Sequence, residues 1–211
     1  MKKIVTLLFL LISFIGFGQS VSAPDPKSFI VNTTGQDASG FELTGFSATS
    51  TLLASISLVN PPSGTTFYLN TTTGLTAASG FTLSGNKTKL VFTGTMSSIN
   101  TALASLKINT GSITGDIVLS VAATINPTGF FYNGTNGHFY RPITATNDRT
   151  TYTNARARSL LTTFKGQTGY LITITSADED AFIFANVPAT NVWFAATDEV
   201  VDGRWVIDAG P

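Results

Sequence analysis

Short runs of β-branched and aromatic residues recur about every ten residues between positions 28 and 125, separated by Gly, Pro, Asn and Ser. The runs occupy residues 29–31, 55–59, 66–69, 89–92 and 117–121. Within 55–59 polar and apolar residues alternate, as in a strand with one face on a core and the other in water. Segments 60–64 and 84–87 are rich in residues that fix φ or tolerate positive φ. The spacing predicts an all-β sandwich over residues 19–126.

One segment, 94–106, breaks this rhythm. Its apolar residues fall at i, i+3, i+7 and i+10: Met96, Ile99, Leu103 and Leu106. That period predicts a short helix with one buried stripe, capped by Thr95 or Ser97. The pattern F-x-G-T-x-x-x-I-N-x-A-L-A-S-L resembles a segment of bacterial cadherin-like and immunoglobulin-like surface repeats. The resemblance implies that the helix is a crossover between strands and not a site.

The N-terminal residues read as an export signal. Lys2 and Lys3 precede an apolar run over residues 4–17, which is too short to span a bilayer. The small-x-small pattern at 16–18 predicts cleavage before Gln19, so that residues 1–18 are a signal peptide. We therefore expect a protein that is secreted or displayed on the cell surface, with no membrane insertion after the signal is removed. The resemblance to bacterial surface repeats implies that it is a bacterial protein.

The net charge limits the kinds of partner that the protein can bind, and the absence of cysteine limits the kinds of metal site that it can form. Without Lys2 and Lys3, ten basic residues face twelve acidic ones, a net charge of about −2. This balance argues against nucleic-acid and anionic-membrane partners. Cysteine is absent, so the chain forms neither disulfides nor thiolate metal sites. The length and the 43% hydrophobic content fit two small domains held together by packing.

A second domain is expected over residues 127–211. Pro127 and Gly129 interrupt the chain after the last strand run and mark the boundary. Residues 130–132 and 138–140 then read as two strands around an Asn-Gly turn. Two helices are expected to follow, which makes this domain α+β.

The two helices have recognisable caps. The first should begin at Thr150 or Thr151 and stop at Gly166. Its predicted buried stripe is Ala157, Leu160, Leu161 and Phe164. Ser176 and Glu179 predict a capping box for the second helix, which Pro188 ends. Its predicted stripe is Ala177, Ala181, Phe184 and Ala185. The second helix is interpreted as scaffolding.

The order of segments after His138 is more specific. H-F-Y at 138–140 leads through the alanine-rich helix to G-Y-L-I-T-I at 169–174 and S-A-D-E at 176–179. N-V-W-F at 191–194 and D-G-R-W at 202–205 follow. This order resembles the N-terminal half of a C-type lectin-like domain, over about residues 130–211. The resemblance implies a domain truncated at its C-terminal end, with Trp193 and Trp205 in its core and the ligand-binding residues after Pro211.

No catalytic arrangement emerges from the residues. His138 is the only histidine and falls in a predicted strand, which excludes an H-E-x-x-H zinc site and disfavours a serine triad. Neither a G-x-S-x-G elbow nor a G-x-x-x-x-G-K-[ST] phosphate loop is present. Asp178, Glu179 and Asp180 are explained by capping and the helix dipole. We expect a protein that is not an enzyme.

Four acidic residues near the end of the chain offer the oxygen ligands that Ca²⁺ prefers: Asp198, Glu199, Asp202 and Asp208. They do not fit an EF-hand, because Val200 occupies the third loop position and Ala209 stands where the bidentate Glu belongs. The resemblance implies that Asp198, Glu199 and Asp202 join an auxiliary calcium site in the complete domain. The alternative is a solvated turn between two strands.

These inferences favour a binding function. In that hypothesis an adhesin-like protein uses the sandwich as a spacer and presents the lectin-like module to a glycan or a surface protein. A second hypothesis is the accessory region of an exported polysaccharide-acting enzyme or peptidase, with its catalytic domain beyond Pro211. A third is a purely structural stalk.

Overall fold

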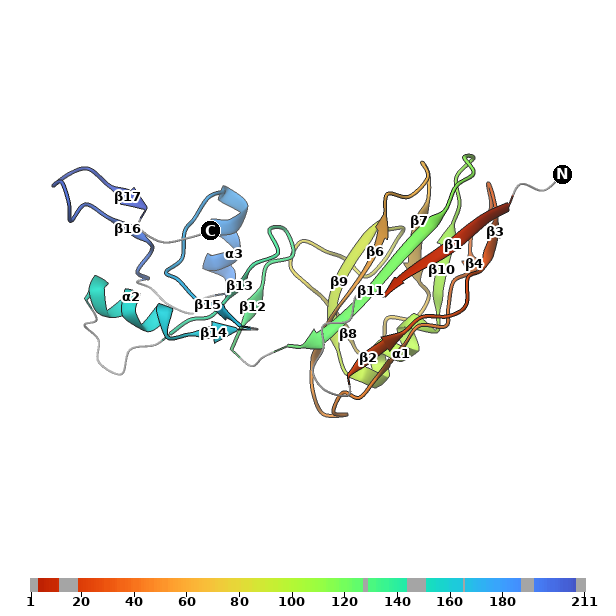
Figure 1. Ribbon diagram of the computed structural model, residues 1–211, viewed down its shortest axis with the longest axis horizontal. Coiled ribbons are helices and arrows are strands. Elements are labelled where there is room, and N and C mark those ends of the chain that lie inside the picture. The colour runs from red at the N-terminus through yellow and green to blue at the C-terminus, as the bar shows by residue number, and fades with distance from the viewer. Residues whose placement is uncertain are drawn as a thin grey trace. The chain divides into compact units, whose positions relative to one another are not determined.

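The computed structural model describes residues 4–11, 19–126, 129–143, 151–164, 166–186 and 192–207 (Figure 1). Several sequence predictions concern residues outside these ranges, namely Lys2, Lys3, residues 16–18, Pro127, Thr150, Pro188 and Asp208. The chain divides into two compact units, Met1–Thr128 and Gly129–Pro211, here called unit 1 and unit 2. Within these ranges the secondary structure is mostly β, with three short helices. None of the helices in the described ranges has the length and apolar content that crossing a membrane requires.

Unit 1 contains two main sheets (Figure 1). The larger has the order β3-β1-β11-β6-β9-β8 and the smaller the order β4-β10-β7, while β2 pairs with β5. The larger sheet consists of β1 (Ile4–Leu11), β3 (Ser28–Ile30), β6 (Leu52–Val59), β8 (Leu75–Ala77), β9 (Lys89–Gly94) and β11 (Ile117–Ile125). The others are β2 (Ser20–Ser22), β4 (Gln36–Asp37), β5 (Glu42–Thr44), β7 (Thr66–Leu69) and β10 (Leu106–Asn109). All five predicted strand runs lie in or overlap strands of this unit.

The core of unit 1 lies between the two sheets. Phe92 from the larger sheet and Phe67 from the smaller are both completely buried, and Ile108 joins the same cluster. In β6 the predicted alternation is confirmed, because Ile56 is buried while Ser55 and Ser57 are half-buried. Burying each of these large side chains contributes about 1.5–3 kcal/mol. Packing of alternate residues therefore stabilises a sandwich that has no disulfide.

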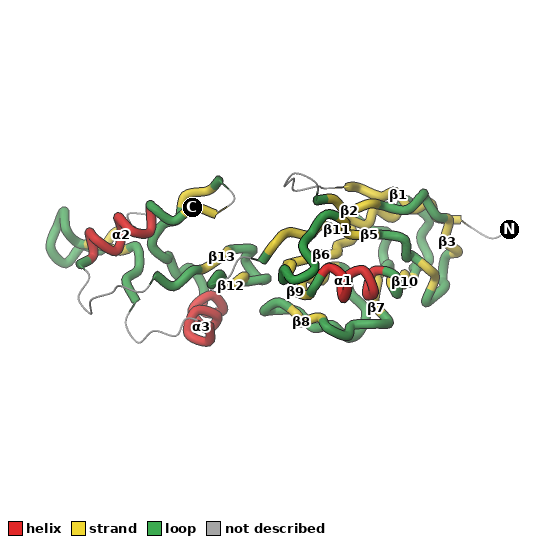
Figure 2. Tube along the Cα trace, turned by 90° about the horizontal axis from the view of Figure 1, so that it is seen from below, coloured by secondary structure: helices red, strands yellow, loops and turns green. Residues whose placement is uncertain are grey.

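Helix α1 (Met96–Leu103) connects β9 to β10 and so crosses from one sheet to the other (Figure 2). The Thr95 hydroxyl accepts a hydrogen bond from the Ser98 amide, which confirms one of the two predicted caps. The predicted stripe is confirmed at Ile99 and Leu103, whereas Leu106 lies in β10. Asn100 then fixes the helix to β5, because its side chain accepts from the Leu43 amide at 2.8 Å and donates to the Leu43 carbonyl at 3.0 Å.

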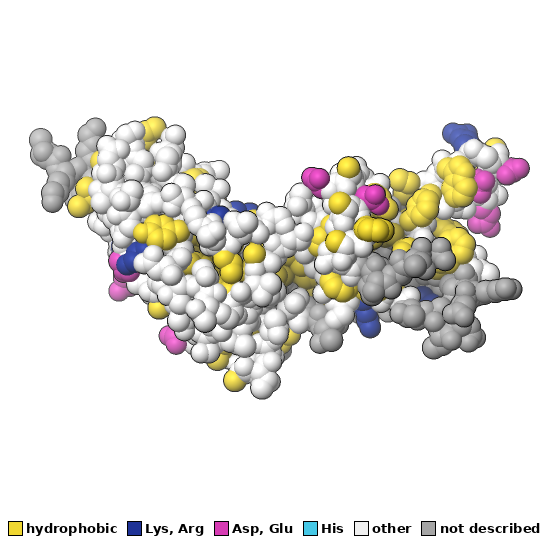
Figure 3. Space-filling view, turned by 180° about the vertical axis from the view of Figure 1, so that it is seen from behind, with side chains coloured by type: hydrophobic (Ala, Val, Ile, Leu, Met, Phe, Trp, Pro, Cys, Tyr) yellow, Lys and Arg dark blue, Asp and Glu magenta, His cyan; other side chains and the backbone are white. Residues whose placement is uncertain are grey.

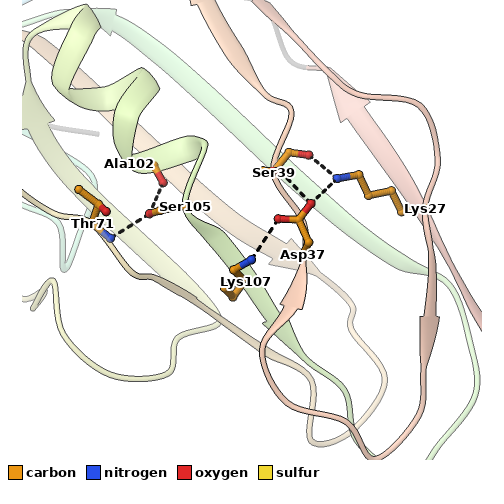
Figure 4. Close-up of polar contacts among 7 residues, drawn as sticks. All are labelled: Lys27, Asp37, Ser39, Thr71, Ala102, Ser105 and Lys107. Atoms are coloured by element: carbon orange, nitrogen blue, oxygen red, sulfur yellow. Dashed lines mark hydrogen bonds and ion pairs between the residues drawn. The ribbon is translucent and has the colours of Figure 1, made fainter.

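Two groups of polar contacts lie at the smaller sheet (Figure 4). Asp37 in β4 accepts hydrogen bonds from Lys27 at 2.9 Å and Lys107 at 3.2 Å. The Lys27 ammonium, together with Ser39 and Lys107, holds the pKa of Asp37 well below its usual range. At the end of α1, the Ser105 hydroxyl donates to the Ala102 carbonyl and accepts from the Thr71 amide.

The described residues of unit 2 form three two-stranded hairpins and two helices. The strands are β12 (Phe131–Tyr132), β13 (Phe139–Tyr140), β14 (Thr163–Phe164), β15 (Gln167–Thr168), β16 (Ala196–Thr197) and β17 (Val206–Ile207). The helices are α2 (Tyr152–Leu160) and α3 (Ala177–Asn186). The predicted Asn-Gly hairpin is confirmed by β12 and β13. Aromatic rings fill its base, with centroids 4.9 Å apart for Phe130–Phe164 and 4.7 Å apart for Phe139–Phe164.

The predicted stripe of α2 is wrong. Leu160 and Leu161 are exposed, at 44% and 82%, and the buried residue of the helix is Ser159. The helix ends against the backbone at Gly169, whose amide donates to the Thr162 carbonyl at 2.7 Å. A Cβ at position 169 would stand 2.8 Å from the Ser159 carbonyl oxygen. This close approach turns Ser159 inward and both leucines outward. The predicted cap at Thr151 is confirmed, but Gly166 lies in the β14–β15 turn and does not stop the helix.

The predicted stripe of α3 is also wrong. Phe184 is 90% exposed, and the buried residues are Glu179, Phe182 and Ile183. These three lie at i, i+3 and i+4, so the helix does present one buried face, but that face includes a carboxylate. An apolar pattern cannot identify a face that contains Glu. The buried face of α3 therefore depends on what the carboxylate contacts.

Candidate functional site

Glu179 is the centre of the main polar cluster in the described part of unit 2. We define the Glu179 cluster as Asn136, Tyr140, Thr175 and Glu179. Glu179 is 3% exposed although it lies in the first turn of α3. A carboxylate buried to this degree requires hydrogen-bond donors, because leaving it unpaired would cost several kcal/mol.

Both carboxylate oxygens have donors. Oε1 accepts from the Tyr140 hydroxyl at 2.6 Å and from the Asn136 amide at 3.3 Å. Oε2 accepts from the backbone N–H and the hydroxyl of Thr175, both at 2.8 Å. The cluster therefore joins the β12–β13 turn, strand β13 and the start of α3, although Tyr140 and Glu179 are 39 residues apart in sequence.

The capping prediction is confirmed in part. The Glu179 amide donates to the Ser176 hydroxyl at 3.2 Å, so Ser176 is the N-cap. The Glu179 side chain, however, accepts from Thr175, one residue before the cap, instead of from the Ser176 backbone as in a standard capping box. The interpretation of Glu179 as a capping residue alone missed its bonds to Tyr140 and Asn136, for which the sequence contains no local signal.

Electrostatics show which protonation states the cluster favours. Burial alone would raise the pKa of the Glu179 carboxyl, but hydrogen bonds from Tyr140 and Thr175 outweigh it and hold that pKa below its ordinary value. Burial, supported by the bond to Glu179, raises the pKa of Tyr140 to about 12. The folded unit therefore favours a charged carboxylate beside a neutral phenol. This is the arrangement of a structural tie, since neither group is poised to exchange a proton near neutral pH.

His138 stands beside this cluster. Its backbone amide donates to the Asn136 side-chain carbonyl at 3.0 Å, and its ring lies 6.3 Å from the Tyr140 ring. It occupies the residue before β13, close to the predicted strand position. These contacts make His138 a structural residue of the β12–β13 hairpin.

The predicted calcium ligands lie in the turn between β16 and β17. Asp198 Oδ2 accepts from the Gly203 amide at 3.2 Å, and Gly203 has a φ of +77°, which favours glycine. Glu199 and Asp202 are exposed on the same turn. Within the described residues no group of three His, Cys, Asp or Glu side chains is placed to hold a metal. The observed arrangement is that of a turn, and calcium binding by a complete domain stays a prediction.

The same hairpin and the segment just before it carry exposed apolar side chains, and Figure 3 shows apolar side chains beside acidic ones on unit 2. We define the hairpin patch as Val192, Trp193, Phe194, Val200, Val201, Trp205, Val206 and Ile207, all exposed. Trp193 is 49% exposed and meets Tyr152 edge-on with ring centroids 6.0 Å apart, while Trp205 is 64% exposed. The expectation that both tryptophans are core residues is therefore wrong for the chain described here.

Comparison with known proteins provides no family for the chain. No family model matches it, and no curated protein or solved structure matches it either. The assignment of a function therefore rests on the residues of this chain.

Proposed function

We propose that the protein is an exported, adhesin-like binding protein of the bacterial surface or exterior. Unit 1 serves as a spacer and unit 2 as a C-type lectin-like module that recognises a glycan or a surface protein. The observation that carries the proposal is the hairpin patch, a set of exposed aromatic and aliphatic residues on the β16–β17 hairpin and the segment just before it. Exposed apolar residues gathered on one short segment of chain are typical of interaction sites.

The chemistry of the patch suits recognition. Tryptophan side chains supply large, rigid contact areas and are enriched at the centres of interfaces. The exposed indole of Trp205 also suits stacking against a sugar ring. Asp198 and Glu199, on the adjoining turn, supply hydrogen-bond acceptors for hydroxyl or amide groups of a ligand. An apolar platform with a polar rim is the common anatomy of a binding surface.

A different role for the patch follows from the lectin-like resemblance. In a complete domain, later strands would cover Trp193 and Trp205, and the ligand would bind to residues after Pro211. The two roles differ in what a substitution does. A ligand-contacting Trp205 affects affinity and leaves stability unchanged, whereas a covered Trp205 affects stability.

The test uses the complete secreted product on a glycan array and against purified surface proteins, with Trp205→Ala as the variant. Phe184→Ser is the matched control, because Phe184 is 90% exposed on α3, outside the patch. The proposal requires saturable binding that Trp205→Ala weakens at least about tenfold, a loss of about 1.4 kcal/mol, and that the control retains. Absence of binding by the unmodified protein, or equal binding by the Trp205→Ala variant, contradicts it.

A further inference from the structure

Strand β1 occupies an interior position in the larger sheet of unit 1. It lies between β3 and β11 (Figure 1). Leu7 to Leu11 pair in parallel with Ile117 to Val121 of β11. Ile4 to Thr6 pair in antiparallel fashion with β3. The strand thus joins the edge strand β3 to the rest of the sheet.

The same residues belong to the predicted export signal. Cleavage before Gln19 would remove β1 entirely. The mature N-terminus cannot replace it, because β2 begins at Ser20 and pairs with β5. If the signal is removed, the mature sheet therefore lacks a strand that the precursor holds.

After the loss of β1, strand β11 is still paired along its other edge. β11 pairs with β6 from Val118 to Ile125. Its core-facing residues Ile117, Leu119 and Val121 are at most 1% exposed. Loss of β1 therefore leaves β11 in place with a row of unpaired backbone N–H and C=O groups at residues 117–121. An edge of this kind is a template for an added strand.

The chemistry of the gap specifies its occupant. Residues 117–121 and β3 contain no charged side chain, and neither does the sequence of β1, I-V-T-L-L-F-L-L. A charged segment would lose its hydration beside such strands, whereas an uncharged apolar strand would not. The direction follows from the register, since β1 runs parallel to β11.

We propose that signal removal opens a strand slot, bounded by residues 117–121 of β11 and by β3, which receives an uncharged, extended apolar segment of another protein. The segment enters parallel to β11 and binds by strand addition. The slot makes unit 1 a site of assembly as well as a spacer. The proposal rests on the signal prediction and is independent of the hairpin patch in unit 2.

The experiment uses the mature chain, residues 19–211, and a labelled synthetic peptide with the sequence of residues 2–11 as the probe. Lys2 and Lys3 keep the peptide soluble. Binding is measured by fluorescence anisotropy, and amide hydrogen exchange locates it. The expected result is saturable binding with slower exchange at residues 117–121, because a ladder partner protects those amides. The mass of the exported protein, measured first, must correspond to a start near Gln19.

A control peptide carries Leu7→Pro and Phe9→Pro, which keeps it apolar but removes two backbone donors. It should bind at least about tenfold more weakly, because a proline removes a ladder hydrogen bond. Equal binding by both peptides, or protection confined to unit 2, would show adhesion to exposed apolar surface and overturn the proposal. The proposal is also overturned if the exported protein retains residues 4–11 or if the mature chain does not bind the peptide. It is likewise overturned if the mature chain self-associates and residues 117–121 are protected without peptide.

Discussion

Replacing Glu179 with Gln tests whether one buried carboxylate holds unit 2 together. The substitution keeps the size of the side chain and removes its charge. In the folded protein the carboxylate accepts four hydrogen bonds, two at each oxygen. The glutamine oxygen can still accept from Tyr140 and Asn136, but its NH₂ group then faces the N–H of Thr175, donor against donor.

The magnitude follows from these bonds. Hydrogen bonds to a charged acceptor contribute about 1.5–3 kcal/mol each, against about 1 kcal/mol for neutral pairs. A buried backbone N–H left without an acceptor costs a further 1–3 kcal/mol or so. Since the Thr175 hydroxyl can rotate to accept, we expect Glu179→Gln to lower the free energy of unfolding of unit 2 by about 3 kcal/mol. That is a large part of the roughly 5–15 kcal/mol that stabilises a whole domain.

Urea denaturation followed by tryptophan fluorescence measures this loss, because both tryptophans of the chain, Trp193 and Trp205, lie in unit 2. With an m-value of about 1–1.5 kcal/mol/M for a small domain, the unfolding midpoint should fall by about 2–3 M. Glu199→Gln is the matched control. Glu199 is exposed in the β16–β17 turn, so its variant should stay within about 0.5 kcal/mol of the unmodified protein.

Acidification provides a second readout with a definite sign. The pKa of Glu179 is lower in the folded state, so its contribution is present above the ordinary pKa and is lost as pH falls through the folded pKa. The difference between the unmodified protein and Glu179→Gln should therefore shrink in acid. A midpoint for Glu179→Gln equal to that of Glu199→Gln at neutral pH would refute the account of Glu179 as the tie between α3 and the first hairpin.

Three further outcomes are expected. Burial and the bond to Glu179 raise the pKa of Tyr140 to about 12, so unit 2 should lose stability as pH rises from about 10 toward 12, and Tyr140→Phe should flatten that loss in alkaline denaturation. Asp37→Asn should lower the stability of unit 1 by about 1 kcal/mol or less in thermal unfolding, because the Asp37 side chain is 52% exposed; a loss above about 2 kcal/mol would contradict this. Limited proteolysis should leave residues 19–126 intact while unit 2 is cleaved; equal cleavage rates would show that the boundary is misplaced.

The strands and the helix of unit 1 could be predicted from its sequence, because its apolar residues recur with the period of the element that contains them. Ile56 and its neighbours in β6 show which face is buried without any knowledge of the partner strand. The cap at Thr95 and the stripe through Ile99 and Leu103 likewise depend on residues within one turn of each other. The sheet order could not be predicted in the same way. Nothing local in Leu7 specifies a parallel partner at Ile117.

The buried faces of the helices in unit 2 could not be predicted from the sequence, for a different reason. Its strands are two residues long, so they have no measurable alternation, and its helices bury Ser159 and Glu179 where the apolar pattern pointed to leucine and alanine. Both exceptions arise from contacts with residues outside the helix concerned. Hydrophobic periodicity identifies a face only when packing is apolar, and here a backbone approach at Gly169 and a hydrogen bond from Tyr140 determine the faces instead.

The two units differ in what stabilises them, and this difference predicts how each responds to a ligand. Many buried side chains share the stabilisation of unit 1, so one edge contact contributes a small part of it. Unit 2 buries few large apolar residues in its described part, so the Glu179 cluster carries a larger share of its stability. A ligand or a covering segment that buries the hairpin patch would add apolar contacts where they are scarce. Binding should therefore stabilise unit 2 strongly and leave unit 1 unchanged, because a ligand stabilises only the folded state to which it binds.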